Sequence, residues 1–224
     1  AFGIPINFKA THIEGISNLE QKDIMYAEDL GYKIKLLGIT KCFNEIVEQR
    51  VHPTLIPKNQ LVANVDGAMN AVLVQGNKVG PTLYYGAGAG SEPTASAVVA
   101  DIIDLARNIE SNNANSIPIL GFIKDEIKAK KILLIEDITS EFYIRLSMKN
   151  ESGVLDKITQ VFAQHSLSIN AMVQKEIQDD DVVDIIIVTS NIIEKEMEKI
   201  IYEIEALPEN IDKAIKLRIE QLNS

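Results

Sequence analysis

Three glycines at alternating positions, Gly86, Gly88 and Gly90, precede a helical pattern in the stretch YYGAGAGSEPTASAVVAD, residues 84–101. Backbone amides of a glycine-rich turn at a helix N-terminus can bind an anion, because they lack helical partners and the helix dipole favours negative charge. The spacing is GxGxG, however, and the dinucleotide fingerprint is GxGxxG inside a strand–helix–strand unit. The pattern alone favours a tight turn that starts a helix, with a phosphate site as the alternative.

Other residues with useful chemistry are dispersed along the chain. Lys9, His12 and Glu14 are close enough in sequence for acid–base chemistry, although ordinary strand-end and loop residues are the favoured interpretation. The histidines, His12, His52 and His165, lack the spacing of metal ligands, so we predict no metal site.

Two further features have plain interpretations. The consecutive carboxylates Asp179, Asp180 and Asp181 cannot all converge on one cation from a single turn, so a solvated hairpin turn is favoured over a cation site. The single cysteine, Cys42, excludes an internal disulfide and fits a reducing compartment, which predicts a cytoplasmic protein. Its neighbours form no nucleophile signature, so we interpret it as a buried or bystander thiol.

Composition excludes several classes of partner. The 224 residues carry a formal net charge of −10, which disfavours electrostatic binding to nucleic acid or to an anionic membrane surface. No stretch reaches the roughly 18 to 20 apolar residues of a membrane helix. The sequence begins without Met and without a leader, so we expect its start to lie inside a longer protein.

The first part of the chain predicts a mixed, largely antiparallel sheet with helices. Ser17 and Glu20 form a capping-box pattern for a helix that runs to about Leu30, and Gly31 is the expected stop. β-branched and alternating patterns predict strands at residues 32–40, 44–53, 70–76 and 82–86. A further helix with one apolar face is predicted from Pro93 to about Asn108.

A polar, poorly periodic stretch at residues 109–141 separates this part from the rest. We therefore predict domains at residues 1–110 and 142–224, joined by a linker at 111–141. The second domain predicts strand, helix, strand, strand, helix, strand, which is the ferredoxin-like β-α-β-β-α-β order. The fold class of the whole chain is α+β.

Three sequence runs carry a resemblance to a known family. They begin EGISNLEQKD at residues 14–38, RVHPTLIPKN at 50–107 and FYIRLSMKNE at 142–176. In that order they resemble the C-terminal half of bacterial homoserine dehydrogenase. The last run is similar to an ACT domain, the small amino-acid-sensing module of that enzyme.

The resemblance implies an oxidoreductase that interconverts L-homoserine and L-aspartate 4-semialdehyde with NADP or NAD, in threonine, methionine and isoleucine biosynthesis. It also implies that the Rossmann domain and the catalytic lysine precede Ala1. No catalytic residue is then expected in this chain, and the chain alone should be inactive and hold no cofactor. By the same likeness, the residues that approach the nicotinamide end of the cofactor are Gly88, Gly90, Ser91 and Glu92.

The ACT resemblance further implies feedback sensing of an end product, threonine. The family's turn after the first strand has an acidic residue followed by Pro-Gly, whereas this chain has NESGVL. Amides of this turn could bind a ligand carboxylate, and the side-chain carbonyl of Asn170 could accept from an ammonium group. A plain helix cap and a plain turn are the alternative. The candidate effector residues are Asn150, Ser152, Gly153, Val154, Leu155 and Asn170.

Two hypotheses therefore stand side by side. In the first, the chain is part of an oxidoreductase whose nucleotide-binding domain is its missing partner. In the second, it is a non-catalytic, amino-acid-binding regulatory and dimerisation module. Both predict a homo-oligomer, either a dimer or a tetramer.

Overall fold

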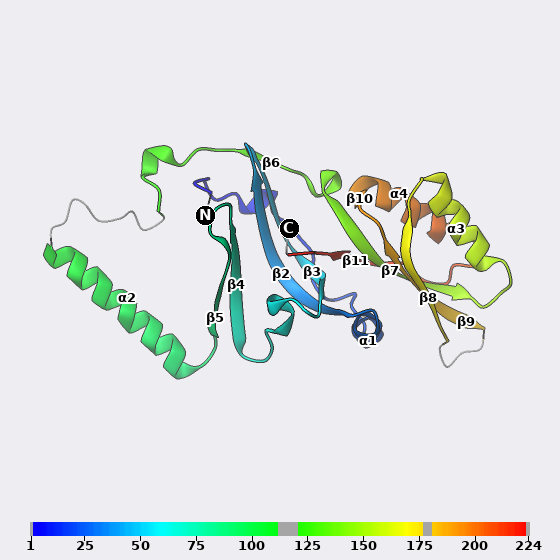
Figure 1. Cartoon of the computed structure of the whole chain (residues 1–224), viewed down its shortest axis with the longest axis horizontal. Helices are drawn as coiled ribbons and strands as arrows, with labels where there is room; N and C mark the ends of the chain where they lie inside the picture. Colours follow the sequence, from blue (N-terminus) through cyan, green and yellow to red (C-terminus); the bar gives the residue numbers. More distant parts are fainter. Residues whose placement is uncertain (1, 112–120, 177–180, 223–224) are drawn as a thin grey trace. The chain divides into compact units, whose positions relative to one another are not determined.

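The structure, a computed structural model, describes residues 2–111, 121–176 and 181–222 (Figure 1). Asp179 and Asp180 of the predicted hairpin turn lie outside the described residues, and so does the part of the predicted linker at 112–120. None of the described helices is both long and apolar enough to cross a membrane.

The chain divides into two compact units. The small unit comprises residues 1–5 and 59–129, and the large unit comprises residues 6–58 and 130–224. The predicted domain limits, 1–110 and 142–224, stay a prediction beside this division.

The small unit contains a β-hairpin followed by a long helix. Strands β4 (Met69–Gly76) and β5 (Gly80–Ala87) pair antiparallel, and Gly80, with φ of +78°, closes the turn between them. Helix α2 (Ser91–Ser111) follows and is longer than the predicted helix. We expected these strands to join the earlier ones in one mixed sheet, which was wrong: in the described residues β4 and β5 pair only with each other.

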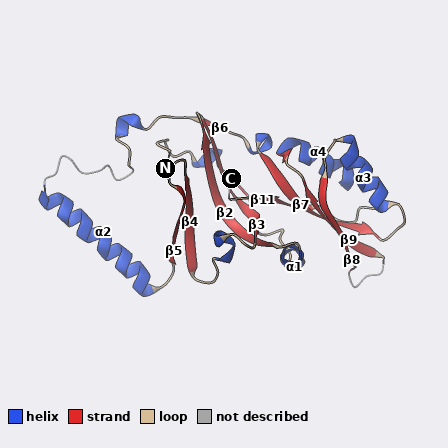
Figure 2. Ribbon diagram, viewed as in Figure 1, coloured by secondary structure: helices blue, strands red, loops and turns tan. Residues whose placement is uncertain are grey.

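The large unit begins with a second, longer hairpin. Strands β2 (Tyr32–Phe43) and β3 (Ile46–Pro57) pair antiparallel along their whole length (Figure 2), and Asn44 adopts the left-handed φ of 55° in the turn. The sequence predicts both strands, and the structure shows each to be longer. The two strands therefore form one continuous, fully paired hairpin within the sheet.

Helix α1 (Gln21–Asp29) precedes this hairpin and corrects one detail of the sequence analysis. Its N-cap is Glu20, and the capping box forms between Glu20 and Asp23, not between Ser17 and Glu20 as predicted. The Glu20 amide donates to the Asp23 carboxylate at 3.0 Å. The predicted stop is confirmed, since Gly31 has φ of +85°.

The C-terminal part of the large unit has the predicted β-α-β-β-α-β order. Its elements are β7 (Thr139–Lys149), α3 (Val154–Gln164), β8 (Ile169–Glu176), β9 (Val182–Thr189), α4 (Glu194–Glu205) and β11 (Ile215–Ile219), with the short β10 (Ile192–Ile193) before α4. The four main strands lie antiparallel in the order β11-β7-β9-β8. The α+β class and the ferredoxin-like arrangement are confirmed.

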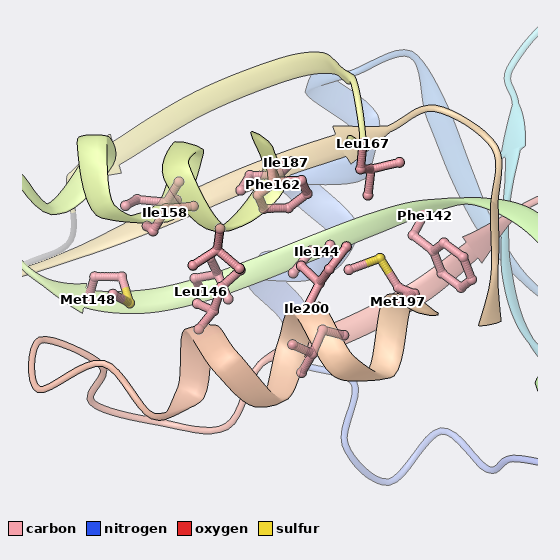
Figure 3. Packing of buried hydrophobic residues seen from close by; sticks show 14 of the residues in the cluster. Phe142, Ile144, Leu146, Met148, Ile158, Phe162, Leu167, Ile187, Met197 and Ile200 are labelled. Atoms are coloured by element: carbon pink, nitrogen blue, oxygen red, sulfur yellow. The ribbon is translucent and has the colours of Figure 1, made fainter. Parts of the chain in front are cut away.

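The hydrophobic core of this part lies between one sheet face and the two helices (Figure 3). Alternate residues of β7 point to the helices, because side chains alternate between the faces of a strand. The labelled members are Phe142, Ile144, Leu146, Met148, Ile158, Phe162, Leu167, Ile187, Met197 and Ile200. Each buried side chain of this size stabilises the fold by roughly 1.5–3 kcal/mol. The opposite sheet face packs against α1, where Ala27 is fully buried.

One sheet joins the two ends of the large unit. The edge of β3 that faces away from β2 pairs in parallel with β6 (Lys131–Ile132), β1 (His12–Ile13) and β11 in turn. Arg218 and Ile219 of β11 lie opposite Thr54 and Leu55 of β3. The result is a nine-stranded sheet that contains both the hairpin and the β-α-β-β-α-β part.

Candidate functional site

A hollow of about 420 Å³ lies at the turn between β7 and α3, the turn that carries the predicted effector residues. We call it the loop pocket. It is lined by Lys149, Asn150, Glu151, Ser152, Gly153, Val154, Leu155, Asp156, Gln174, Val183 and Ile185. The structure thus brings together the five predicted residues from Asn150 to Leu155 with residues of β8 and β9.

Glycine shapes this turn. Gly153 is the N-cap of α3 and adopts the left-handed conformation, with φ of +89° and ψ of −4°. The Asn150 amide donates to the Asp181 carbonyl at 2.9 Å, which ties the turn to the start of β9. Lys157 is the first residue whose amide bonds back to Gly153, at 3.1 Å. Amides of the first helical turn before it have no partner within the helix, and the Val154 amide makes only a 3.5 Å bond to the Glu151 carbonyl. Such amides are suited to donate to an anionic ligand group.

The loop pocket combines three kinds of surface. Lys149 is cationic, and Glu151 and Asp156 are anionic. Leu155 and the β9 residues are apolar. A zwitterion with a short side chain needs this combination: donors for its carboxylate, acceptors for its ammonium group and a small apolar wall.

Asn170, the sixth predicted effector residue, does not line the loop pocket. Its side-chain amide donates to the Thr189 carbonyl at 3.1 Å, beside the irregular register between Ile169 and Ala171. The polar residue of β8 that does line the pocket is Gln174. The signal for it in the sequence is a polar residue on the strand face that otherwise carries apolar residues, such as Met172.

The conformation of the turn before α2 accounts for the glycines at positions 88 and 90. A side chain at Gly88 would overlap the Asn70 side chain, and Gly90 has φ of +126°, which favours glycine. Glu92 adds a negative charge to the first turn of α2, where an anionic pyrophosphate would be repelled. The described residues therefore fit a helix-starting turn and do not by themselves form a site for a dinucleotide phosphate. A place for Gly88, Gly90, Ser91 and Glu92 beside a cofactor stays a prediction.

Glu14 of the possible acid–base group has a structural role. It accepts from His12 at 2.6 Å and from Arg218 at 3.0 and 2.9 Å. Burial raises the pKa of Glu14, but the bonds from Arg218 and His12 outweigh it and hold the pKa at about 2. A carboxylate that is ionised and accepts hydrogen bonds from both His12 and Arg218 is a poor proton acceptor at neutral pH. Lys9 lies in a short 3-10 turn, Phe8–Ala10, outside this cluster.

The same edge of the sheet holds further buried charges. Arg218 also donates to Glu194 at 2.8 and 2.7 Å, and Arg50 bonds to Glu48 and Glu220. Of these pairs, the one between Arg50 and Glu220 links β3 to the residue that follows β11, and the pairs of Arg218 link β11 to Glu14 and to α4. The pairs of Glu14 and Glu220 with arginines therefore help to hold the two ends of the large unit together.

His52 and Cys42 complete the survey of candidate residues. His52 is fully buried and accepts from Arg50 at 3.1 Å. Half-buried Cys42 lies 3.7 Å from the Asn44 carbonyl and 3.9 Å from the Lys130 ammonium group. Over the described ranges no cluster of His, Cys, Asp or Glu could hold a metal ion.

Comparison with known proteins agrees with this architecture. Residues 1–103 match the family described as homoserine dehydrogenase, and residues 142–209 match the ACT domain. The chain is 50% identical over its full length to homoserine dehydrogenase of Neisseria gonorrhoeae, of which it covers 51%. It is 45% identical, again over its full length, to homoserine dehydrogenase of Pseudomonas aeruginosa, of which it covers 52%.

Solved structures give the same assignment. A crystal structure of homoserine dehydrogenase from Thiobacillus denitrificans superimposes with a TM-score of 0.88 at 51% identity, covering 99% of this chain and 50% of that chain. One from S. aureus gives a TM-score of 0.65 at 28% identity and covers 99% and 50% of the two chains. The chain spans about half the length of the relatives it matches. The chain therefore belongs to the homoserine dehydrogenase family and corresponds to the C-terminal half of its members, with an ACT domain at residues 142–209.

Proposed function

We propose that the chain works as the C-terminal half of an enzyme that interconverts L-homoserine and L-aspartate 4-semialdehyde, in threonine, methionine and isoleucine biosynthesis in the cytoplasm. The observation that carries this proposal is the 50% identity to a homoserine dehydrogenase across the full length of the chain. The nicotinamide of NADP or NAD would supply or accept the hydride. A homo-oligomer, dimer or tetramer, is part of the proposal.

The chain's own residues have a supporting role in this reaction. Its acid–base candidate Glu14 is held ionised by Arg218, which supports the proposal that the proton donor and acceptor belong to the remaining half of the enzyme. Gly90 and the α2 N-terminus would lie against the nicotinamide end of the cofactor and position it. The chain alone is then inactive.

The loop pocket would bind a small amino acid effector, for which threonine is the proposed ligand. Amides of the first turn of α3, assisted by Lys149, would hold the carboxylate. Glu151 and Asp156 would hold the ammonium group, and Leu155 with β9 would contact the side chain. The pocket volume of about 420 Å³ leaves ample room for such a ligand.

Calorimetric titration of L-threonine into the 224-residue chain tests the effector site. We expect saturable binding, weakened at least tenfold in the double variant Glu151→Gln, Asp156→Asn, because a hydrogen bond to a charged group contributes roughly 1.5–3 kcal/mol. Asp212→Asn, an exposed carboxylate outside the pocket, is the matched control. Unchanged affinity in the double variant would place the ligand elsewhere.

An assay of homoserine oxidation tests the catalytic part. The chain is incubated with L-homoserine and NADP or NAD, and formation of the reduced cofactor is followed over a wide range of protein concentration. We expect no turnover from the chain and turnover from the full-length protein. Turnover proportional to the concentration of this chain would contradict the proposed division of labour, and a full-length protein without turnover would favour the purely regulatory hypothesis.

A further inference from the structure

We propose that α1 responds to occupancy of the loop pocket through the strands β9 and β8, so that effector binding is transmitted to the β2–β3 hairpin. This inference rests on the proposed function of the loop pocket as an effector site. It concerns residues on the opposite face of the sheet, which do not line that pocket.

Strand alternation provides the physical link. Val183 and Ile185 of β9 line the loop pocket, and Asp184 between them points to the opposite face. Asp184 is fully buried. A displacement of the β9 backbone that accommodates a ligand at its two neighbours must therefore also move this carboxylate.

On the opposite face Asp184 is bonded both to α1 and to β7, where the Arg145 guanidinium lies 3.9 Å from one of its oxygens. The Tyr26 hydroxyl donates to it at 3.2 Å, and the Lys22 ammonium group lies 3.1 Å away. Ser147 of β7 donates to its other oxygen at 2.8 Å. A buried carboxylate that loses a hydrogen-bond partner destabilises the fold, because it has been removed from water without compensation. Small shifts of Asp184 therefore change the free energy of α1 docking.

The neighbouring strand β8 repeats this arrangement. Gln174 lines the loop pocket, and Lys175, the next residue, lies opposite Asp184 on the α1 face. Lys175 forms an ion pair with Asp29 of α1 at 2.8 Å, and its ammonium group lies 6.0 Å from the ring centre of Tyr26. Two adjacent strands thus connect the pocket to α1 by consecutive residues.

Packing of α1 differs between its two ends. At the first turn Arg145 of β7 donates to Asp23 at 2.6 and 3.1 Å, and Tyr143 donates to the same carboxylate at 3.1 Å. Around the last turn lies a second hollow of about 290 Å³, lined by Tyr26, Asp29, Leu30, Val173, Lys175 and Ile186. The last turn is held by exposed contacts, the Lys175–Asp29 pair and a bond from Lys58 to the Glu28 carbonyl at 2.8 Å, whereas the first turn is held by buried ones. Leu30 and Gly31 connect the last turn to β2.

Hydrogen exchange measured by mass spectrometry on the 224-residue chain, with and without saturating L-threonine, tests the inference. We expect threonine to change the exchange rate of amides in residues 20–30 by at least threefold. Coupling between two sites is reciprocal, so a change of α1 docking that responds to threonine should in turn affect the threonine affinity. Variants Tyr26→Phe and Asp184→Asn should reduce the exchange response at residues 20–30 and shift the dissociation constant together.

Tyr202→Phe is the matched control, because Tyr202 is an exposed tyrosine on α4. It should keep the exchange response of the unaltered chain. Tyr26→Phe removes one hydroxyl from a half-buried residue and keeps the experiment decisive if Asp184→Asn does not fold. Threonine binding without any change at residues 20–30 would overturn the inference and leave the effector site standing. A response that persists in Tyr26→Phe would also overturn it, and failure of the unaltered chain to bind threonine would overturn both proposals.

Discussion

Buried ionisable residues of the large unit make its stability depend on pH. Burial, followed by the charge of Arg218, lowers the pKa of His52 to about 4 from its usual 6.5. A histidine with a lower pKa in the folded state stabilises the fold above pH 6.5, and this contribution is lost as the pH falls from 6.5 to 4. Glu14, whose pKa is lowered from 4.5 to about 2, also stabilises the fold, and its contribution is lost mainly as the pH falls from 4.5 to 2.

Urea unfolding at several pH values checks this prediction. The free energy of unfolding should fall by up to about 1.4 kcal/mol per pH unit between pH 6.5 and 4 through this group. His52→Gln should flatten that dependence. The control His165→Gln, at a ring bonded to Glu203 near the surface, should retain the slope of the unaltered chain. Equal slopes in all three proteins would show that His52 is not the titrating group.

Backbone conformation at Gly153 gives a second prediction at the residue scale. The left-handed conformation costs a residue with a side chain roughly 1–2 kcal/mol, whereas asparagine tolerates it better. Gly153→Ala should therefore lower the free energy of unfolding by about 1 kcal/mol or more, and Gly153→Asn by less. Gly86→Ala, where an added Cβ meets no atom within 4 Å and φ is not positive, is the control for urea unfolding. Gly153→Ala with unaltered stability would contradict the conformation.

Residue patterns predicted the site only as far as local chain geometry determines it. The predicted residues from Asn150 to Leu155 line one hollow because one turn before one helix carries them, and their role as effector residues stays a prediction. Asn170 does not line the loop pocket and Gln174 does, because the orientation of each depends on register and on a local irregularity of β8. A single sequence contains no direct signal for that irregularity.

At the scale of elements, one buried ion pair contributes strongly to the docking of α1. Arg145 is nearly fully buried and bonded to Asp23, which is fully buried. Loss of one partner leaves an uncompensated buried charge, which costs roughly 3–5 kcal/mol. Arg145→Leu should lower the free energy of unfolding by that amount. Lys195→Ala, which removes an exposed pair with Asp137, should change it by less than about 1 kcal/mol.

Urea unfolding monitored by circular dichroism measures both variants. A small effect of Arg145→Leu, similar to that of Lys195→Ala, would mean that α1 is held by apolar packing around Ala27. The combined variant Arg145→Leu, Asp23→Leu separates the two explanations, because removal of both charges eliminates the unpaired group and should recover part of the lost stability.

Element boundaries show which sequence signals are strong. The helices and strands of the β-α-β-β-α-β part were predictable because their apolar periods are long and uninterrupted. The start of α1 was misplaced because the sequence contains two possible capping boxes, one after the other. Ser17 with Glu20 forms the first pattern, and Glu20 with Asp23 forms the second. Tertiary bonds from Arg145 and Tyr143 to Asp23 distinguish the second pair.

At the scale of the whole molecule, the nine-stranded sheet is the feature that sequence patterns could not predict. Parallel pairing of Arg218 and Ile219 with Thr54 and Leu55 joins segments more than 160 residues apart. No local pattern encodes such a pairing, because it arises from packing of the complete chain. The ACT domain of this chain is consequently built into a larger sheet on its β11 edge.

This integration predicts that the ACT segment depends on the hairpin for its stability. Residues 138–222 expressed alone would lose α1 from one sheet face, where Tyr143, Ile186 and Leu217 are buried, and would lose β3 from the β11 edge. An exposed apolar face beside an unpaired edge strand favours self-association. We therefore expect this segment to be less stable than the complete chain by several kcal/mol, on the order of the burial of a few large side chains, and to associate.

The matched comparison removes the small unit and keeps the sheet. In this variant a flexible glycine-serine linker replaces residues 59–129 and joins Lys58 to Lys130, so that the large unit retains all of its strands. In urea unfolding this variant should be more stable than the 138–222 segment by several kcal/mol. In sedimentation velocity it should not show the self-association expected of that segment. A monomeric 138–222 segment as stable as this variant would show that the junction of β3 with β11 contributes no stability, and the ACT domain would then be an independent module that only abuts the hairpin.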